Sequence, residues 1–185
     1  ETLQFSTIAL IDDVTRCVTM DSKVAGDLVY VLGTTRNELG ASEYYAHLGY
    51  LGRNVPEVRP DEFAPSYRHL MHAIENGLVA SAHGIYRGGL AVHLAMVAMG
   101  GNLGLQADLT QVPGGGKMRD DVLLFSESAG RFIVTIDPDK REAFEDIFQA
   151  SPCARIGTVT DGSDLVINGM GQQPIVRVPV ADLKT

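Results

Sequence analysis

Runs of apolar residues separated by glycine, proline and acidic positions mark the expected strands. Strand patterns lie at 27–33, 79–86, 103–109, 131–136 and 175–178. The first of these, DLVYVLG, is almost entirely apolar until Gly33, which is typical of a buried strand closed by a glycine. Two more runs, 153–159 and 164–168, flank an Asp-Gly pair at 161–162, and this spacing predicts a β-hairpin.

Apolar residues at helical spacing mark the other elements. Helices are expected at 43–51, 61–76, 89–99, 122–125 and 138–150. In the second of these, Leu70 and Ile74 fall on one face, and Gly77 is typical of a residue just past a helix end. In the last, Phe144 and Phe148 form the apolar face.

Strands in clusters with several helices between them predict an α+β fold, a layered mixed β-sheet flanked by helices. The chain has 185 residues, of which 45% are hydrophobic and 21% charged, so residues 1–185 are expected to form a single domain with its own core. The first residue is Glu1 and not methionine, which favours a chain that is processed or excised from a longer protein. An excised domain is expected to expose an apolar face where its neighbours dock.

Charge and cysteine content narrow the class of protein. Fifteen basic and 23 acidic residues give a net charge of −8, and no basic stripe is present, so nucleic-acid binding is not expected. The two cysteines form no CxxC pair, which favours a reducing, cytoplasmic location. No apolar stretch is long enough for a membrane span, and the N-terminus has no signal-peptide pattern, so no membrane partner is expected.

Several familiar catalytic motifs are absent or incomplete. The GGGK at 114–117 is followed by Met118, so it lacks the hydroxyl that a phosphate-binding P-loop places on magnesium, and an exposed flexible loop is the simpler interpretation. Neither H-E-x-x-H nor G-x-S-x-G occurs, which argues against a zinc site and a serine hydrolase. No metal ligands and no catalytic residue are therefore assigned.

The segment LFSESAGR offers candidate ligands for a phosphate. Ser126 and Ser128 supply hydroxyls, Arg131 supplies a guanidinium, and Glu127 can orient that arginine or bond to a ribose hydroxyl. The alternative is a helix cap followed by the first residue of a strand, a common use of serine.

The segment SAHGIYRGGLAVHLAMVAMGG offers a second candidate. Gly88 and Gly89 allow a tight turn or a close backbone approach, and free N–H groups at the following helix start can bind an anion with help from Arg87. His83 precedes this turn and is a further candidate. If the fold brings the two segments together, they form one pocket for a ribonucleotide phosphate.

The segment NELGASEYY contributes two secondary candidates. Ser42 is expected to cap a helix, and Glu43 follows it in the first turn, where the helix dipole favours a carboxylate. A structural role and a binding role both fit this pattern.

Four segments in one order carry a resemblance that covers almost the whole chain, from about residue 7 to residue 179. DDVTRCVTMDSKVAGDLVYVLGTTRNELGASEYY, AHGIYRGGLAVHLAMVAMGGNLGLQADL, LFSESAGRFIVTI and ARIGTVT together resemble the C-terminal domain of phosphoribosylformylglycinamidine synthase. The glycine-plus-helix segment is shared with aminoimidazole ribonucleotide synthetase, selenophosphate synthetase and hydrogenase-maturation relatives.

The resemblance implies one domain of an ATP-dependent, C–N bond-forming ligase of purine biosynthesis. The whole enzyme converts formylglycinamide ribonucleotide, ATP and glutamine-derived ammonia into the amidine. ATP and Mg²⁺ then belong to the intact enzyme and are not held by this fragment alone, which is expected to be inactive. The implied partners are the remaining domains of the synthase, a fused or separate glutaminase, and the ribonucleotide.

One departure from the family pattern changes the expected chemistry. Many relatives read HDVSDGGL where this chain reads HGIYRGGL, so Gly84, Tyr86 and Arg87 stand where aspartate, serine and aspartate are common. The loss of two carboxylates favours an anion-binding or structural role over a metal site. The alternatives left open are a non-catalytic structural module of the same assembly and a domain of another relative, such as selenophosphate synthetase.

Overall fold

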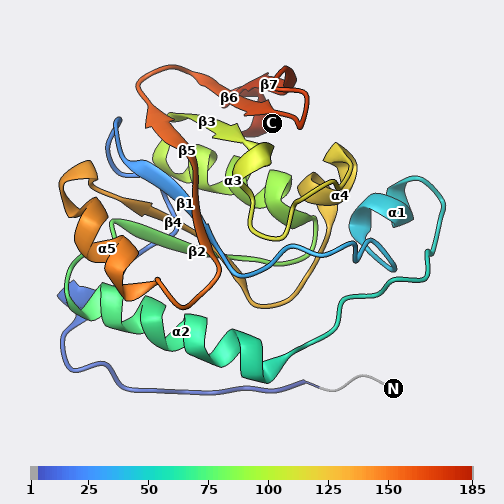
Figure 1. Ribbon diagram of the computed structural model, residues 1–185. Helices are drawn as coiled ribbons and strands as arrows, with labels where there is room; N and C mark the ends of the chain where they lie inside the picture. The colour runs from blue at the N-terminus through green and yellow to red at the C-terminus, as the bar shows by residue number, and fades with distance from the viewer. Residues whose placement is uncertain (1–3, 185) are drawn as a thin grey trace.

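A mixed sheet of seven strands forms the centre of the computed structural model, which describes residues 4–184 (Figure 1). The strands are β1 (Leu28–Leu32), β2 (Ser81–Ile85), β3 (Gly104–Asp108), β4 (Arg131–Ile136), β5 (Cys153–Thr160), β6 (Asp164–Asn168) and β7 (Pro174–Pro179). Their order across the sheet is β2-β4-β1-β5-β3-β6-β7. Every neighbouring pair is antiparallel except β3 and β6.

Helices cover both faces of this sheet. They are α1 (Glu43–His47), α2 (Pro60–Glu75), α3 (Gly89–Gly101), α4 (Asp120–Phe125) and α5 (Arg141–Ile147). Short 3₁₀ turns lie at Val14–Arg16, Leu109–Gln111, Pro138–Lys140 and Asp182–Lys184. None of the helices in residues 4–184 is both long and apolar enough to cross a membrane.

The alternation of side chains along β1 explains its unbroken apolar run. Val29 and Val31 belong to the core cluster under α3, whereas Leu28, Tyr30 and Leu32 belong to the cluster under α2 and α5. Because successive side chains of a strand point to opposite faces, a strand covered on both sides must be apolar at every position. The predicted α+β fold, a mixed sheet flanked by helices, is confirmed.

Two predicted helices are shorter in the structure. The helix expected at 43–51 ends at His47, because Gly49 has a φ of +78° and the Tyr50 N–H turns back to the Tyr45 carbonyl. The helix expected at 138–150 begins as a 3₁₀ turn capped by the Asp137 side chain and continues only as α5.

The predicted hairpin at 153–159 and 164–168 is wrong. β3 lies between β5 and β6, and the Gly104 N–H donates to the Gly162 carbonyl as the connection passes over the start of β3. The reversal of direction was predicted correctly, but the adjacency was not. Four Cα–Cα steps reach up to about 14 Å, enough to cross two strand spacings of about 4.8 Å each, so an Asp-Gly turn does not require direct pairing.

Large apolar side chains stay exposed in two segments. In the extended stretch at 5–14, Ile8 and Leu10 are each 98% exposed. The connection at 48–58 exposes Leu48, Tyr50, Leu51, Val55 and Val58. The described part of the chain thus exposes several large apolar side chains, and the expected docking face stays a prediction.

Candidate functional site

Glu127 joins the three segments that contain the sequence-predicted site residues. Its Oε1 accepts hydrogen bonds from the backbone N–H of Gly88 at 2.8 Å and of Glu43 at 2.9 Å. Arg87 forms an ion pair with the Glu43 carboxylate. The two main segments therefore lie side by side, which meets the condition stated for a shared pocket. We call Glu43, Arg87, Gly88 and Glu127 the Glu127 crossing.

Close packing between the start of α3 and the end of α4 requires the glycine pair. Gly88 and Gly89 have φ angles of +93° and +73°, in the left-handed region that favours glycine. A Cβ added at Gly89 would lie 2.6 Å from the Cα of Phe125. These glycines therefore allow the close packing of α3 on α4, and they also place the Gly88 N–H against Glu127.

Ser42 holds the first turn of α1. Its Oγ accepts from the Tyr45 N–H at 3.2 Å and donates to the Leu39 carbonyl at 2.7 Å, as expected for a helix cap. Ser42 is buried, while Glu43 is part of the exposed surface. Of the two secondary candidates, only Glu43 is open to a ligand.

Ser126 and Ser128 are buried, and both bond to the segment that follows β1. The Ser126 Oγ donates to the Arg36 carbonyl at 2.6 Å and accepts from the Glu38 N–H at 3.3 Å. The Ser128 Oγ accepts from the Arg36 N–H at 3.1 Å. Both hydroxyls therefore satisfy backbone groups of this chain.

Arg131 is the largest fully buried side chain and is only 1% exposed. Its Nε donates to the Ser128 carbonyl at 3.0 Å, its Nη1 donates to the Thr35 hydroxyl at 3.0 Å, and its Nη2 donates to the Ser126 carbonyl. Burial lowers the pKa of Arg131 to about 10, partly offset by the negative charge of Glu38 and Glu127.

This placement separates Arg131 from Arg87. The Arg87 side chain is 82% exposed, whereas the Arg131 guanidinium is enclosed and donates three hydrogen bonds within the chain, so the two cations do not line one open cavity. Direct contact between Arg131 and a phosphate has no support from this geometry. A role for the segment in the site stays a prediction and rests on the backbone groups that Glu127 positions.

The turn between β2 and α3 contains a pair of histidines. The Tyr86 N–H donates to Nε2 of His93 at 2.9 Å, so the proton of that ring is on Nδ1, which donates to Nε2 of His83 at 2.8 Å. Burial lowers the pKa of both histidines, and the neighbouring His93 lowers that of His83 further. No sequence pattern links His83 with His93, which are ten positions apart.

The departure from the HDVSDGGL pattern has a local explanation. The Tyr86 hydroxyl lies where a Cβ at position 84 would be, so Gly84 and Tyr86 fit each other. In residues 4–184, no three His, Cys, Asp or Glu side chains gather as potential metal ligands. The turn is therefore described by its aromatic and histidine contacts.

Acidification is expected to destabilise the fold through this histidine pair. Both pKa values are lowered on folding, so below pH about 6.5 the unfolded chain binds protons that the folded chain does not, and stability is lost as pH falls. Urea unfolding between pH 7.5 and 5.5 should show a loss of up to about 1.4 kcal/mol per pH unit for each histidine.

His93→Gln should reduce this pH dependence, while replacement of the exposed His72 by glutamine should leave it unchanged. An equal slope in the wild type and His93→Gln would show that the pair does not carry the effect.

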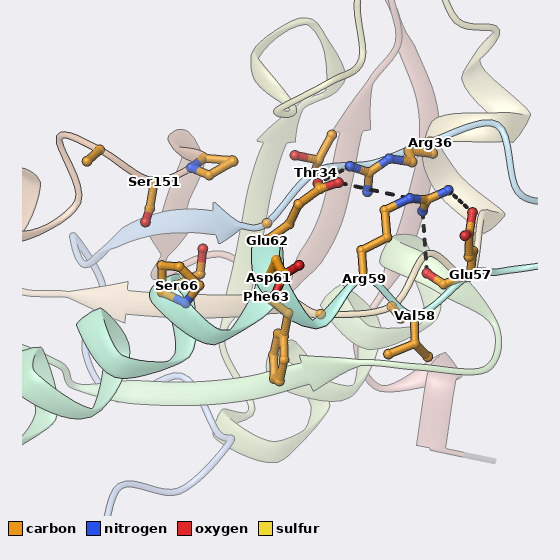
Figure 2. A pocket seen from close by; sticks show the side chains of 16 residues that line it. Thr34, Arg36, Glu57, Val58, Arg59, Asp61, Glu62, Phe63, Ser66 and Ser151 are labelled. Atoms are coloured by element: carbon orange, nitrogen blue, oxygen red, sulfur yellow. Dashed lines mark hydrogen bonds and ion pairs between the residues drawn. The ribbon is translucent and has the colours of Figure 1, made fainter.

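A cavity of about 380 Å³ opens between the first turn of α2, the end of β1 and the turn before β4 (Figure 2). Its rim holds two guanidinium groups, from Arg36 and Arg59, with Glu57 and Glu62 beside them. None of these four residues was among the candidates from the sequence. For Glu57, Arg59 and Glu62 the sequence signal was the mixture of charges around the Pro60 helix start, which is also common at exposed helix ends, and Arg36 lies in a distant segment.

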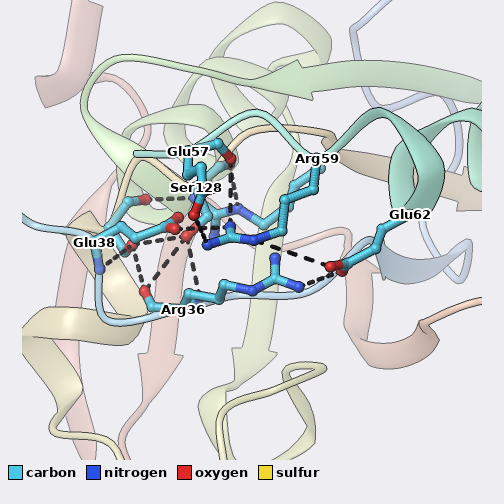
Figure 3. Close-up of polar contacts among 8 residues, drawn as sticks. Arg36, Glu38, Glu57, Arg59, Glu62 and Ser128 are labelled. Atoms are coloured by element: carbon cyan, nitrogen blue, oxygen red, sulfur yellow. Dashed lines mark hydrogen bonds and ion pairs between the residues drawn. The ribbon is translucent and has the colours of Figure 1, made fainter. Parts of the chain in front are cut away.

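Carboxylates neutralise both arginines of this cavity (Figure 3). Nη1 of Arg59 donates to Oε1 of Glu38 at 2.9 Å, and Arg59 also pairs with Glu57. Arg36 pairs with Glu62. Three carboxylates surround two guanidiniums, so an added phosphate would have to displace existing ion pairs.

Comparisons with known proteins agree along most of the chain. "Phosphoribosylformylglycinamidine synthase subunit PurL" of Thermococcus gammatolerans is 40% identical over 159 residues, covering 86% of this chain and 22% of that protein. The protein of the same name from Alkaliphilus metalliredigens is 34% identical over 181 residues, covering 96% of this chain and 23% of that protein. The chain thus spans less than a quarter of the length of these relatives.

Solved structures and a family description identify the domain. "T. maritima PurL complexed with FGAR" superimposes with a TM-score of 0.79 at 21% identity, covering 92% of this chain and 30% of that chain. "Hydrogenase Maturation Protein HypE in complex with ATP" gives 0.61 at 19% identity, covering 89% of this chain and 54% of that chain. At such identities the likeness shows the shared fold. Because "AIR synthase related protein, C-terminal domain" matches residues 24–169, the chain belongs to this family.

Proposed function

We propose that this chain is the C-terminal AIR-synthase-type domain of a phosphoribosylformylglycinamidine synthase. In the proposed reaction, an amide oxygen of formylglycinamide ribonucleotide is phosphorylated by ATP and then displaced by ammonia derived from glutamine. The observation that carries the proposal is the 40% identity to the Thermococcus gammatolerans PurL subunit along 86% of the chain.

The Glu127 crossing is the part of the chain proposed to contact the ribonucleotide. The Arg87 side chain is highly exposed, and its one ion-pair partner among the described residues is the Glu43 carboxylate. A phosphate would bond to the guanidinium donors that this ion pair leaves unused, or would compete with Glu43 for the others. Glu127 fixes the backbone on both sides of that ion pair. We assign phosphate binding to Arg87 and the positioning of the surrounding backbone to Glu127. His83, whose ring contacts that of Tyr86, remains a candidate.

ATP and Mg²⁺ are proposed to bind outside this chain in the intact enzyme. Three T. maritima PurL structures contain ATP, AMPPCP or ADP, which supports nucleotide binding by the longer protein. The described residues of this chain do not fit a magnesium site, since no three potential ligands gather among them. No metal-dependent step is therefore derived for its own residues.

The remaining domains and a glutaminase are the proposed partners. "PurLQS from Thermotoga maritima" is an assembly that contains PurL, and it supports a multisubunit arrangement. The exposed apolar segments at 5–14 and 48–58 are the proposed contact surfaces with the rest of the synthase. A cytoplasmic location follows from this pathway assignment.

The proposal is tested with the 185-residue chain and with the full-length gene product that contains it. The full-length protein should form ADP in the presence of formylglycinamide ribonucleotide, ATP and ammonium, whereas the chain alone should show no turnover, because phosphoryl transfer needs several elements positioned together. A reading frame without the remaining synthase domains, or a full-length protein without this activity, would overturn the proposal.

In the full-length protein, Arg87→Gln should raise the KM for the ribonucleotide about tenfold or more and leave kcat nearly unchanged. One charge-assisted hydrogen bond to a phosphate accounts for this size, and it acts on ground and transition states alike. Arg68→Gln is the matched control, because Arg68 is exposed on α2 and forms no ion pair among the described residues.

A second candidate function is a structural module that contacts no substrate. The burial of Ser126, Ser128 and Arg131 favours it, because these side chains already bond within the chain. If Arg87→Gln keeps the wild-type KM and kcat while the full-length protein is active, the structural function is the correct one. Selenide-dependent ATP turnover without amidine formation would instead indicate a selenophosphate synthetase.

A further inference from the structure

A second cavity, of about 460 Å³, differs in charge from the rest of the protein. It is lined by Asn37, Tyr45, Gly114, Gly115, Gly116, Lys117, Met118, Arg119 and Val122. The lining includes two cations and no carboxylate, although the chain has a net charge of −8. None of the residues of the Glu127 crossing takes part in it. The cavity at the start of α2, in contrast, is lined by more acidic than basic side chains.

The glycine loop at 114–116 approaches neighbouring groups closely at its first two positions. A Cβ at Gly114 would lie 2.6 Å from the Thr34 side chain, and one at Gly115 would lie 2.9 Å from the Val112 carbonyl. The Thr35 N–H also donates to the Pro113 carbonyl at 2.9 Å, which ties the loop to the segment after β1. The expected exposed loop is confirmed at Gly114, Gly116 and Lys117, while Gly115 is buried against the protein body.

Donor groups of this loop are unused. Gly114 and Gly116 have φ angles of +80° and +48°, and turns with alternating left-handed residues present backbone N–H groups to anions. Within residues 4–184, no acceptor bonds to the N–H of Gly116 or of Lys117, and the Lys117 ammonium has no ion-pair partner. Arg119 supplies a second cation, although it already pairs with Asp121.

We propose that this cavity binds the phosphoryl group of a small phosphate ester. Lys117 and Arg119 supply charge, and the loop N–H groups supply hydrogen bonds. Since Met118 follows the lysine, the hydroxyl that a P-loop uses for a magnesium-bound triphosphate is absent, and a monophosphate is the ligand that fits.

The organic part of the ester is placed by a neighbouring cavity of about 430 Å³. The two cavities share Tyr45 and Arg119. The second is also lined by Tyr44, Leu48, Tyr50, Leu51 and Gly52, and by Asp121, the ion-pair partner of Arg119. The Tyr45 and Tyr50 rings meet edge to face at 6.2 Å. Such an aromatic wall suits the ring of a nucleoside monophosphate, whereas a sugar phosphate would use the phosphoryl site alone.

Isothermal titration calorimetry of the 185-residue chain at low salt tests the site with three probes: inorganic phosphate, ribose 5-phosphate and AMP. Saturable one-to-one binding of all three is expected. Lys117→Gln should weaken each about tenfold, the size of one lost charge-assisted hydrogen bond. Tyr50→Ala should weaken AMP alone. Arg68→Gln, which removes one exposed charge elsewhere, should match the wild type, and circular dichroism should show each variant folded.

If none of the three probes binds saturably, the proposal is wrong. The proposal is also wrong if Lys117→Gln and Arg68→Gln weaken the binding affinity equally, because that result indicates a general effect of charge and not a site. If Tyr50→Ala leaves the affinity for AMP unchanged, the proposed position of the organic part of the phosphate ester is wrong. Because the readout is binding to this chain, the result is independent of whether the longer protein makes the amidine.

Discussion

Replacing Arg131 with methionine is expected to destabilise the chain by about 3–5 kcal/mol, the scale for removing one member of a buried charge network. The substitution leaves the carbonyls of Ser126 and Ser128 without their donor, and it leaves the Thr35 hydroxyl without its partner. It also removes the cation that offsets the buried Glu38 carboxylate. A domain with a total stability of about 5–15 kcal/mol would come close to unfolding.

Urea unfolding followed by circular dichroism measures this loss. Arg68→Met is the matched control, since an exposed arginine without an ion pair should change stability by less than about 0.5 kcal/mol. Arg131→Lys should fall between the two, because lysine keeps the charge but not the planar fork that reaches three acceptors. A loss below about 1 kcal/mol for Arg131→Met would contradict the structural role described for this residue.

The same reasoning affects how kinetic data on Arg131 are interpreted. A full-length variant with altered KM would first have to be shown folded, because the guanidinium holds together the segments before β4 and after β1. Arg87 is the better residue for a binding test, since its side chain is exposed and its removal leaves no buried group unpaired.

Gly89→Ala is expected to destabilise the chain by about 2–5 kcal/mol. About 1–2 kcal/mol comes from placing a side chain at a φ of +73°, and about 1–3 kcal/mol comes from overpacking against the backbone of Phe125 and the Leu124 carbonyl. Backbone atoms cannot rotate away as a flexible side chain can, so the start of α3 or the end of α4 must move.

Gly77→Ala separates the two causes. Gly77 has a φ of +66° after α2, but a Cβ there would meet nothing within 4 Å, so only the conformational cost applies. In thermal or urea unfolding, the Gly89→Ala variant should therefore be clearly less stable than the Gly77→Ala variant. Equal losses would mean that the approach of α3 to α4 is not tight.

Much of the architecture could be predicted because it depends on local pattern. β1 and α2 appear close to their expected positions, since a run buried on both faces and a helix with a proline start carry strong signals. The order of strands could not be predicted in the same way. The Asp-Gly turn between β5 and β6 has the chemistry of a hairpin, yet β3 enters between them, because adjacency depends on where the whole sheet places its strands.

The residues of the candidate site were likewise predictable only in part. The glycines and Glu127 were found from the sequence, because turns with positive φ and a carboxylate in a serine-rich segment leave a visible mark. The sequence did not indicate which of the candidate side chains are exposed to solvent and which are buried. Ser128 and Arg131 have the chemistry of phosphate ligands, but both bond inside the chain. The basic lining around Lys117 lies in a GGGK segment that does not match a P-loop.

The α+β class, most helices and strands, the family resemblance and the two candidate segments were predictable from the chain alone, because they follow from local periodicity, turn chemistry and motif order. The strand order, the meeting of those segments at Glu127, the His83–His93 pair, the burial of Arg131 and the basic cavity around the glycine loop emerge only in the folded molecule. Accessibility and charge pairing are set by residues distant in the chain, such as Thr35 against Arg131, and no local pattern records which groups they bond.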